Sequence, residues 1–483
     1  MSQPISSAQY TSSLQTLRNL HIRIDLLDFN FFVVNNIEGT AIDGSVIVNA
    51  TSDIRRTCNI SFTVTDSSFD IQAGGQVWLD KYIMVFSGID DIRTNEIAWT
   101  NLGTFLINEP SYIYDNSTKT MSFQCVDLMA KLTGLRNGEI IGIGEEGYTL
   151  IPVGSNVREA IIGIITTCGF TRYYVSECIN ADGTIQDVPY DMKYDQGTTW
   201  YKILKDLSEI LPNYQIYFDV DGVFRYEPIP SGENDPIMID ETLWKENVIS
   251  ENINISFNDV KNFVEVWGRV HETDYYSDSE STLIANNIIQ PTWSGLIELE
   301  NYVVVALSLA QNISNNRGIY ISFLDRILYI KDFNKENIKY LPKDEYLVFS
   351  YSEDGYWLYL GGAQAHATFE DDNPESPFYV GSTIGRIPIV LSGKDYENII
   401  SDDLALERAK FEIYNRCRLN DSINLTTVPI YWADVNWKVS YTPLSGEREQ
   451  ADYMIKTINI PLSTNGTQTW NLIRFYPFYP VIS

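Results

Sequence analysis

The chain has few residues whose types and spacing could support catalysis or bind a metal ion. Its three histidines, His21, His271 and His366, are far apart, and neither an HExxH nor an HxH pattern occurs. His21 lies in an alternating segment, so a structural role is favoured over a catalytic one. No Gly-x-Ser-x-Gly elbow nominates a nucleophile, although a Ser-His-Asp triad that assembles only in space leaves no such motif. The residues alone favour a protein that is not an enzyme.

The five cysteines are also poorly placed for chemistry. Cys58, Cys125, Cys168, Cys178 and Cys417 are scattered and form no CxxC pair, so neither a zinc ribbon nor a dithiol redox motif is expected. The polar N-terminal segment lacks the basic and apolar regions of a secretion signal. We therefore expect reduced, mostly buried thiols in a protein that folds in a cytoplasm.

Three short segments resemble ligand-binding loops, but their context favours other roles. Residues 142–147 match GxGxxG, yet Pro152 follows where a helix should open, and two glutamates inside the motif would repel a phosphate. Residues 219–222 begin like a calcium loop, but the glycine comes fourth instead of sixth, which favours a turn. Residues 370–373 are a better calcium candidate, although a solvated acidic loop is the favoured interpretation. We predict no catalytic residue, no cofactor and no metal site.

The composition limits both the class of protein and its partners. Among 483 residues, 64 Asp and Glu outnumber 34 Lys and Arg, for a net charge of −30. Phosphate binding needs clustered cations, so specific nucleic-acid binding is not expected. The hydrophobic share of 44% excludes disorder of the whole chain, and at about 150 residues per domain the length suggests three domains. No apolar run approaches the roughly 18 residues of a membrane span.

The elements that would position any site are mostly strands. Short segments such as 21–25 and 60–65 alternate polar and apolar side chains, as half-buried strands do, and further strands are expected up to residue 125. Asp43-Gly44 predicts a two-residue hairpin turn. A short helix is expected over 127–132. This pattern predicts a β-barrel or sandwich with one helix at its end.

The middle of the chain changes character. Ser155 is expected to cap a helix that ends at Gly169, and Thr198 or Thr199 a second helix that stops at Pro212. Asp221-Gly222 lies between two apolar runs and predicts a hairpin. The segment is therefore expected to be a small α+β domain.

Strands return after residue 248, with a helix expected from Ser401 or Asp402 to about Cys417. Between 272 and 382 the chain is polar and aromatic, with a hairpin expected from 346–351 and 356–361 and no convincing helix. The predicted fold is mainly β with an α+β middle, plus a β-rich insertion. Its domains are 1–136 (first β-barrel), 137–247 (α+β), 248–271 with 383–483 (second β-barrel) and 272–382 (insertion).

Several strings resemble tail hub proteins of tailed bacteriophages, a family that includes the baseplate hubs of contractile tails. Asn101-Leu-Gly-Thr-Phe-Leu-Ile-Asn-Glu-Pro110, followed by residues 122–129, is similar to the first tube-like β-barrel domain of that family. Residues 262–268 are similar to the opening strand of the family's second tube-like domain. Residues 399–409 are similar to its helix, and residues 428–437 and 456–463 to its closing strands. The resemblance covers nearly the whole chain except the insertion.

This resemblance implies a structural protein of the virion, placed at the tail tip or baseplate and folded in the bacterial host. Two tube-like barrels in each of three chains would form a pseudo-sixfold ring. The ring would adapt the hexameric tail tube to a central spike, fibre or tape-measure protein, and DNA would pass through its acidic lumen during ejection. The alternative is a host-surface carbohydrate-binding tail protein that acts through the insertion; a cell-wall hydrolase is the less favoured third possibility.

Aromatic residues are the candidate contacts with partners. The candidate interface residues are Trp432, Trp437, Phe475, Tyr476, Phe478 and Tyr479. The Pro-rich end that carries the last four packs either on a neighbouring chain or on its own barrel. On the insertion, Tyr351, Tyr356 and Trp357 are the candidate surface aromatics, which could stack on sugars or seat a baseplate protein.

Overall fold

The computed structural model describes residues 20–476, with gaps. The gaps are 39–41, 64–70, 92–95, 115–118, 142–147, 181–182, 190–191, 212, 279–301, 307–317, 324–325, 332–345, 353–354, 394–395, 397–398, 400–401, 445–447 and 464–465. The GxGxxG segment, Phe478 and Tyr479 therefore lie outside the described residues. The chain divides into two compact units, one of residues 1–260 and 414–483 and the other of 261–413.

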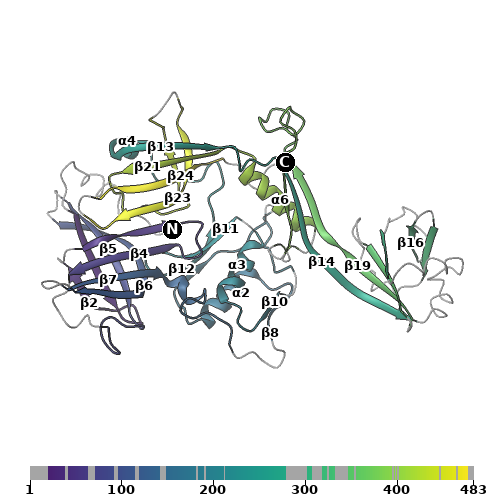
Figure 1. Cartoon of the computed structure of the whole chain (residues 1–483), viewed down its shortest axis with the longest axis horizontal. Helices are drawn as coiled ribbons and strands as arrows, with labels where there is room; N and C mark the ends of the chain where they lie inside the picture. Colours follow the sequence, from purple (N-terminus) through teal and green to yellow (C-terminus); the bar gives the residue numbers. More distant parts are fainter. Residues whose placement is uncertain are drawn as a thin grey trace. The chain divides into compact units, whose positions relative to one another are not determined.

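A twelve-stranded sheet organises the first unit (Figure 1). Its strands are β1 (Leu20–Leu27), β2 (Val33–Glu38), β3 (Ile42–Asn49), β4 (Arg56–Thr63), β5 (Tyr82–Asp91), β6 (Glu96–Tyr114), β7 (Lys119–Asp127), β13 (Val248–Ser256), β21 (Asn420–Thr427), β22 (Lys438–Tyr441), β23 (Ala451–Pro461) and β24 (Gln468–Arg474). Their order is β13-β21-β24-β23-β3-β4-β7-β6-β5-β1-β2, and β22 pairs with β23. The predicted mainly β class is confirmed.

The sheet joins the two ends of the sequence. Residues 45–49 of β3 pair antiparallel with 457–461 of β23, so strands expected in two separate barrels share one hydrogen-bonded path. That path is open in the part of the chain that the structure describes, and no closure into a barrel is found there. The pairing places side chains from both ends in one core.

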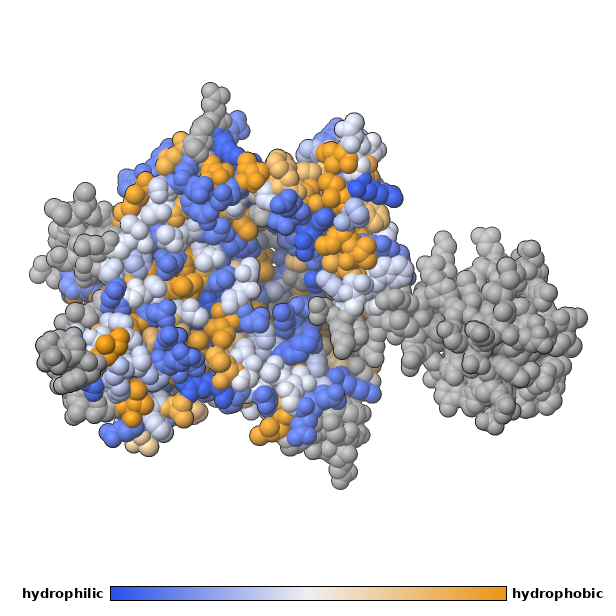
Figure 2. Space-filling view, viewed as in Figure 1, coloured by the Kyte–Doolittle hydropathy of each residue, from blue (hydrophilic) through white to orange (hydrophobic). Residues whose placement is uncertain are grey.

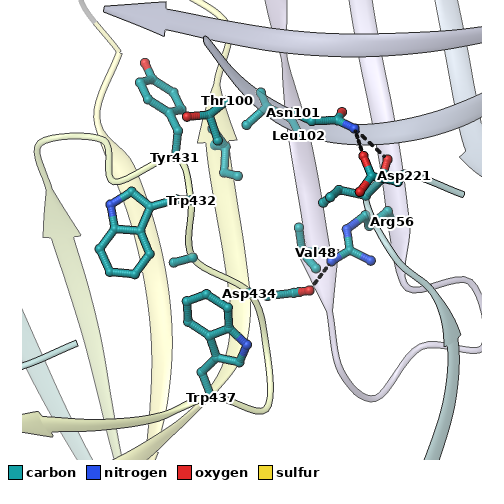
Figure 3. Close-up of a pocket in the computed structure, with 13 residues that line it drawn as sticks. Val48, Arg56, Thr100, Asn101, Leu102, Asp221, Tyr431, Trp432, Asp434 and Trp437 are labelled. Atoms are coloured by element: carbon teal, nitrogen blue, oxygen red, sulfur yellow. Dashed lines mark hydrogen bonds and ion pairs between the residues drawn. The ribbon is translucent and has the colours of Figure 1, made fainter. Parts of the chain in front are cut away.

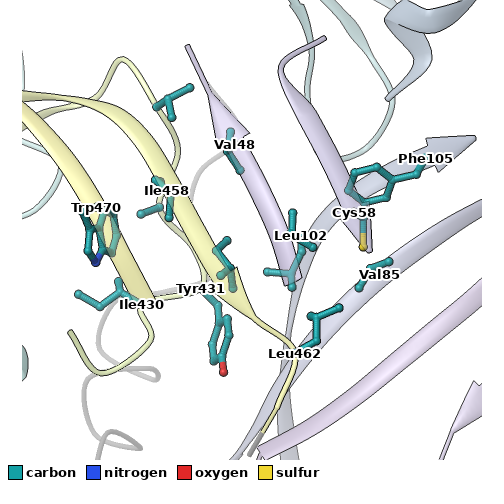
Figure 4. Close-up of a cluster of buried hydrophobic side chains, with 14 of the residues drawn as sticks. Val48, Cys58, Val85, Leu102, Phe105, Ile430, Tyr431, Ile458, Leu462 and Trp470 are labelled. Atoms are coloured by element: carbon teal, nitrogen blue, oxygen red, sulfur yellow. The ribbon is translucent and has the colours of Figure 1, made fainter. Parts of the chain in front are cut away.

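This shared core is apolar and closely packed. Val48 and Leu102 face Tyr431, Ile458 and Leu462 across the β3–β23 junction (Figure 4), and all five are at most 2% exposed. Burying one such large side chain stabilises the fold by roughly 1.5–3 kcal/mol. The first and last parts of the chain therefore depend on each other for their hydrophobic core.

The middle of the chain forms the predicted α+β segment and continues the first unit. Its elements are the 3₁₀ helix η2 (Leu128–Lys131), β8 (Tyr148–Ile151), α2 (Val157–Thr167), β9 (Tyr173–Val175), β10 (Met192–Asp195), α3 (Trp200–Glu209), β11 (Tyr214–Phe218), β12 (Phe224–Pro228) and α4 (Glu241–Asn247). Thr199 caps α3 as predicted, whereas Asn156 and not Ser155 caps α2. The β11–β12 hairpin is confirmed, and α4 was not predicted.

The second unit contains a five-stranded and a two-stranded sheet. The strands are β14 (Phe263–Asp278), β15 (Tyr302–Ala306), β16 (Gly318–Phe323), β17 (Arg326–Lys331), β18 (Tyr346–Ser352), β19 (Gly355–Glu370) and β20 (Pro388–Leu391). The predicted hairpin is the antiparallel pair β18–β19. The helix α6 (Asp402–Arg416) carries the chain back to the first unit. Among the described residues, no helix is long and apolar enough to span a membrane.

The acidic segment 370–373 begins a hydrogen-bonded loop in this second unit. Asp371 accepts a hydrogen bond from the hydroxyl of Ser376, and Glu370 pairs with Arg386 at 2.8 Å. Asn262, fully buried, anchors the loop by donating to the carbonyl oxygens of Phe378 and Gly385 at 2.8 Å each.

The predicted hairpin turn at Asp43-Gly44 is wrong, because both residues lie inside β3. Gly44 has a φ of +149°, and a Cβ there would lie 1.9 Å from the carbonyl oxygen of Asn59 on β4. The glycine thus permits the close approach of two strands instead of a change of direction.

Gly44→Ala should destabilise the protein, because the new methyl group collides with the backbone of Asn59. We expect the Tm to fall by about 5–10 °C in thermal unfolding. Gly163→Ala is the matched control, since Gly163 lies exposed in α2 with nothing within 4 Å of a Cβ, and it should raise the Tm slightly. Equal effects of the two substitutions would contradict this explanation.

Candidate functional site

Arg56, at the start of β4, binds partners from three parts of the first unit. Its side chain is 2% exposed. Nη1 donates to the carbonyl oxygen of Phe218 at 2.7 Å, and Nη2 pairs with the carboxylate of Asp434 (Figure 3). Its backbone N–H donates to Asp127 at 2.9 Å. One cation therefore ties the N-terminal strands to β11 and to the loop before β22.

Burial changes the electrostatics around this cation. Asp127 is 1% exposed, and burial raises its pKa to about 6 despite hydrogen bonds from the backbone of Arg56 and Met129. Burial also lowers the pKa of the neighbouring Arg55. Arg55 lies 3.7 Å over the ring of Tyr217 and donates to Gln215 at 2.7 Å. Desolvation, rather than a nearby catalytic partner, dominates both shifts.

Lys456 extends the cluster from β23. Its Nζ donates to Oδ1 of Asn436 at 3.2 Å, and Nδ2 of Asn436 donates to Gln215 at 2.8 Å. Burial lowers the pKa of Lys456 to about 8, and the positive charges of Arg418 and Arg55 add to the effect. Asn436 holds this position with a φ of 58°, a left-handed conformation that Asn tolerates better than most residues.

A pocket of about 200 Å³ opens beside the arginine. It is lined by Val48, Arg56, Thr100, Asn101, Leu102, Val220, Asp221, Tyr431, Trp432, Ala433, Asp434, Trp437 and Ile460. Two of the predicted interface residues, Trp432 and Trp437, form one wall, with ring centroids 5.8 Å apart (Figure 3). Both are partly buried against the shared core.

The other predicted site residues lie elsewhere. Phe475 is 6% exposed, under Nζ of Lys438 at 4.8 Å, and the ring of Tyr476 lies 5.6 Å from Arg418. Both therefore contact their own chain.

The aromatic residues of the insertion are described only by their backbone. Tyr351 and Tyr356 are opposite each other in β18–β19, and Trp357 is opposite Ser350. The interface and surface roles of all these aromatic residues stay predictions.

Two of the three histidines, His21 and His366, each contact one carboxylate. His21 contacts Asp90 at 2.8 Å, and His366 contacts Glu265 at 3.1 Å, with its ring centroid 3.9 Å from that of Trp267 at a tilt of 31°. Within the described residues, no group of three or more His, Cys, Asp or Glu could hold a metal ion.

Sequence reasoning missed the arginine cluster. The available signal was a pair of consecutive arginines, Arg55 and Arg56, opening a strand in a chain that is poor in cations.

The comparisons with known proteins give one likeness that carries the fold, to a solved prophage tail protein. Residues 375–479 match a family model described as a domain of unknown function (DUF5048), and no curated protein matches the sequence. The 43 kDa tail protein of prophage MuSo2 from Shewanella oneidensis is similar in structure, with a TM-score of 0.51, 11% identity, and coverage of 94% of this chain and 98% of that one. The expected likeness to phage tail proteins is thus confirmed for the fold.

Two further tail proteins are similar at lower scores. One is from Neisseria meningitidis MC58, with a TM-score of 0.49, 8% identity, and coverage of 94% and 96% of the two chains. The other is prophage tail protein gp18 from Listeria monocytogenes EGD-e, with a TM-score of 0.43, 9% identity and coverage of 94% of each chain.

Lys456→Met should stabilise the protein at neutral pH. The pKa of Lys456 falls from 10.5 to about 8 on folding, so between these values the unfolded state binds more protons. Stability therefore rises with pH across this window, and the cost of burying the charge is fully present below it. We expect the substitution to raise the Tm at pH 7 by about 5 °C and to flatten its rise from pH 8 to 10.5.

The control for this prediction is Lys245→Met, in which an exposed lysine of α4 (69% exposed) is replaced. Its Tm should follow the wild type at each pH. A lower Tm for Lys456→Met at pH 7 would show that the charged lysine stabilises the fold.

Asp434→Asn should be strongly destabilising, because it leaves the buried guanidinium of Arg56 without its carboxylate. We expect a loss of about 3–5 kcal/mol, and a smaller loss when Arg56→Met is combined with it. Lys205→Met breaks the exposed Lys205–Asp53 pair and should cost less than about 1 kcal/mol. Additive effects in the urea-unfolding cycle would refute the coupling of Arg56 to Asp434.

Proposed function

We propose that this chain is a structural hub of a phage tail or phage-derived particle, and that three copies form a ring. The similarity of its fold to a prophage tail protein over nearly the full length of both chains supports the class. The observation that carries the assembly is the pair of edges that the twelve-stranded sheet leaves open among the described residues.

Both edge strands carry exposed apolar side chains. On β2, Val33 and Val34 are 57% and 50% exposed; on β13, Ile249 and Ile255 are 57% and 43% exposed. Soluble monomers commonly protect such edges with Lys or Pro. Neither strand contains either residue. These edges are therefore suited to pair with another chain.

The two edges differ, so their pairing would be head-to-tail. A contact between unlike surfaces generates a closed ring when the rotation between copies closes. Each copy would contribute an N-terminal strand group, β1–β7, and a C-terminal group, β13 with β21–β24. A ring of three would present six such groups to a hexameric tail tube. A spike, fibre or tape-measure protein would occupy the opposite face.

The surface suits a conduit for DNA. On the face in Figure 2, apolar residues are interspersed with hydrophilic ones over the described surface, as is normal for soluble proteins. The net charge of −30 would repel phosphates from a lumen lined by carboxylates, so DNA would pass without binding.

The oligomeric state tests this proposal. Light scattering should give three times the chain mass of 55.1 kDa, and negative-stain images should show a ring with a central hole. Val34→Lys on β2 and Ile255→Lys on β13 should each yield monomers, because a charge on an edge opposes strand pairing.

Val153→Lys is the matched control, since Val153 is 59% exposed in the α+β segment and its substitution should leave the ring intact. A wild-type monomer at every concentration, also when co-expressed with a tail-tube protein, would overturn the proposal.

A further inference from the structure

The turn between β1 and β2 presents large apolar side chains to the solvent. In this aromatic turn, residues 28–32, Phe29 is 61% and Phe32 is 69% exposed. Val33 and Val34 follow at once, in the edge strand β2. Single exposed apolar side chains are normal in soluble proteins, whereas a contiguous group of them marks an interaction site. These four side chains are such a group, at one corner of the sheet.

The aromatic turn is held in one conformation. The carboxylate of Asp28 accepts hydrogen bonds from the backbone N–H groups of Asn30 and Phe32, at 2.9 Å each. The ring of Phe31 stacks on that of Tyr82 with centroids 5.1 Å apart. Phe31 has a φ of 65°, which a bulky side chain rarely adopts. Backbone strain of this kind is concentrated at functional sites, so the turn is a candidate for a contact with a partner.

Two cations border the aromatic turn. Nζ of Lys131 lies 5.2 Å from the ring centroid of Phe29 and donates to the hydroxyl of Tyr82 at 2.8 Å. Cζ of Arg172 lies 5.0 Å from the ring centroid of Phe31. Neither cation pairs with a carboxylate in the part of the chain that the structure describes. A surface that complements the turn is therefore apolar at its centre and acidic at its rim.

The end of β13 offers a surface of this kind. Phe257, directly after β13, is 74% exposed, and Ile255 is 43% exposed. Residues 246–260 include Glu246, Glu251 and Asp259 and no Lys or Arg, and Asp259 is exposed. β2 and β13 are at opposite ends of the strand order. A contact between the turn and the end of β13 would therefore join two copies of the chain.

We propose that the aromatic turn of one copy docks on the end of β13 in the next copy. This contact rests on the ring proposed above and specifies where its subunits interlock. Antiparallel strand pairs outnumber parallel ones by about two- to threefold. Antiparallel pairing of β2 with β13 places the start of β2, and the turn with it, beside the end of β13. Phe32 then packs against Phe257, and Arg172 faces Asp259.

A disulfide cross-link tests the position of the turn. The full chain with both Phe32→Cys and Phe257→Cys should form covalent trimers in oxidised glutathione, visible on a non-reducing gel and lost on reduction. Neither substitution alone should do so. The wild type measures the background from the native cysteines, which are buried or partly buried. Phe32→Cys combined with Ile249→Cys, at the other end of β13, is the matched control and should not cross-link.

The dissociation of the ring tests the energy of the contact. Phe32→Ser should raise the concentration at which light scattering shows half of the rings dissociated by about tenfold, because aromatic anchors carry much of the binding free energy of an interface. Ile141→Ser is the control, since Ile141 is 83% exposed in the α+β segment, and it should have no effect. Circular dichroism shows whether each variant keeps its fold.

The failure of this contact is distinguishable from the failure of the ring. A wild-type ring that Phe32→Ser leaves unchanged would overturn the contact while the ring stands. The absence of a cross-link between positions 32 and 257, or a cross-link of position 32 to 249 in its place, would overturn it in the same way. A wild-type monomer at every concentration, also with a tail-tube protein, would remove both the ring and the contact.

Discussion

The buried guanidinium of Arg56 is the constraint on which the first unit depends. Transferring a charge from water costs several kcal/mol unless hydrogen bonds and an opposite charge replace the solvent. Here the replacements come from β11 and from Asp434, while the backbone of Arg56 holds Asp127. No one of these segments satisfies the cation alone. The cluster therefore selects one arrangement of strands, hairpin and loop, and contributes specificity more than net stability.

Local features of this fold were predictable, whereas its long-range contacts were not. Helix α3 and the hairpin around Asp221 follow from apolar periodicity, a capping threonine and a turn dipeptide, all within a few residues. The pairing of β3 with β23 joins residues about 400 positions apart and leaves no periodic trace in either segment. For the same reason Trp432 and Trp437 could be nominated as aromatic contacts, while their position beside Arg56 could not.

Several of the few cationic side chains of this acidic chain are buried. Lys438 is 2% exposed and contacts Asp452 at 3.1 Å and the carbonyl oxygen of Glu233 at 2.7 Å. Arg55 and Arg56 are buried in the same way, at 5% and 2% exposed. The sequence has 34 Lys and Arg and 64 Asp and Glu. A cation that is buried without a buried carboxylate beside it removes one positive charge from the surface. The surface charge is then more negative than the net charge of the whole sequence. The buried cations and the negative surface, which repels phosphates, thus both follow from where the chain places its charged residues.

The β3–β23 junction also sets an order of events during synthesis. At roughly 5–20 residues per second, about 20–80 s pass between the emergence of β3 from the ribosome and that of β23. Throughout this interval β3 can pair with β4 on one side, while its other edge lacks β23 and the shared core lacks the side chains of the C-terminal strands. The joining of the two ends in one sheet therefore delays completion of the shared core until the C-terminal strands have been synthesised.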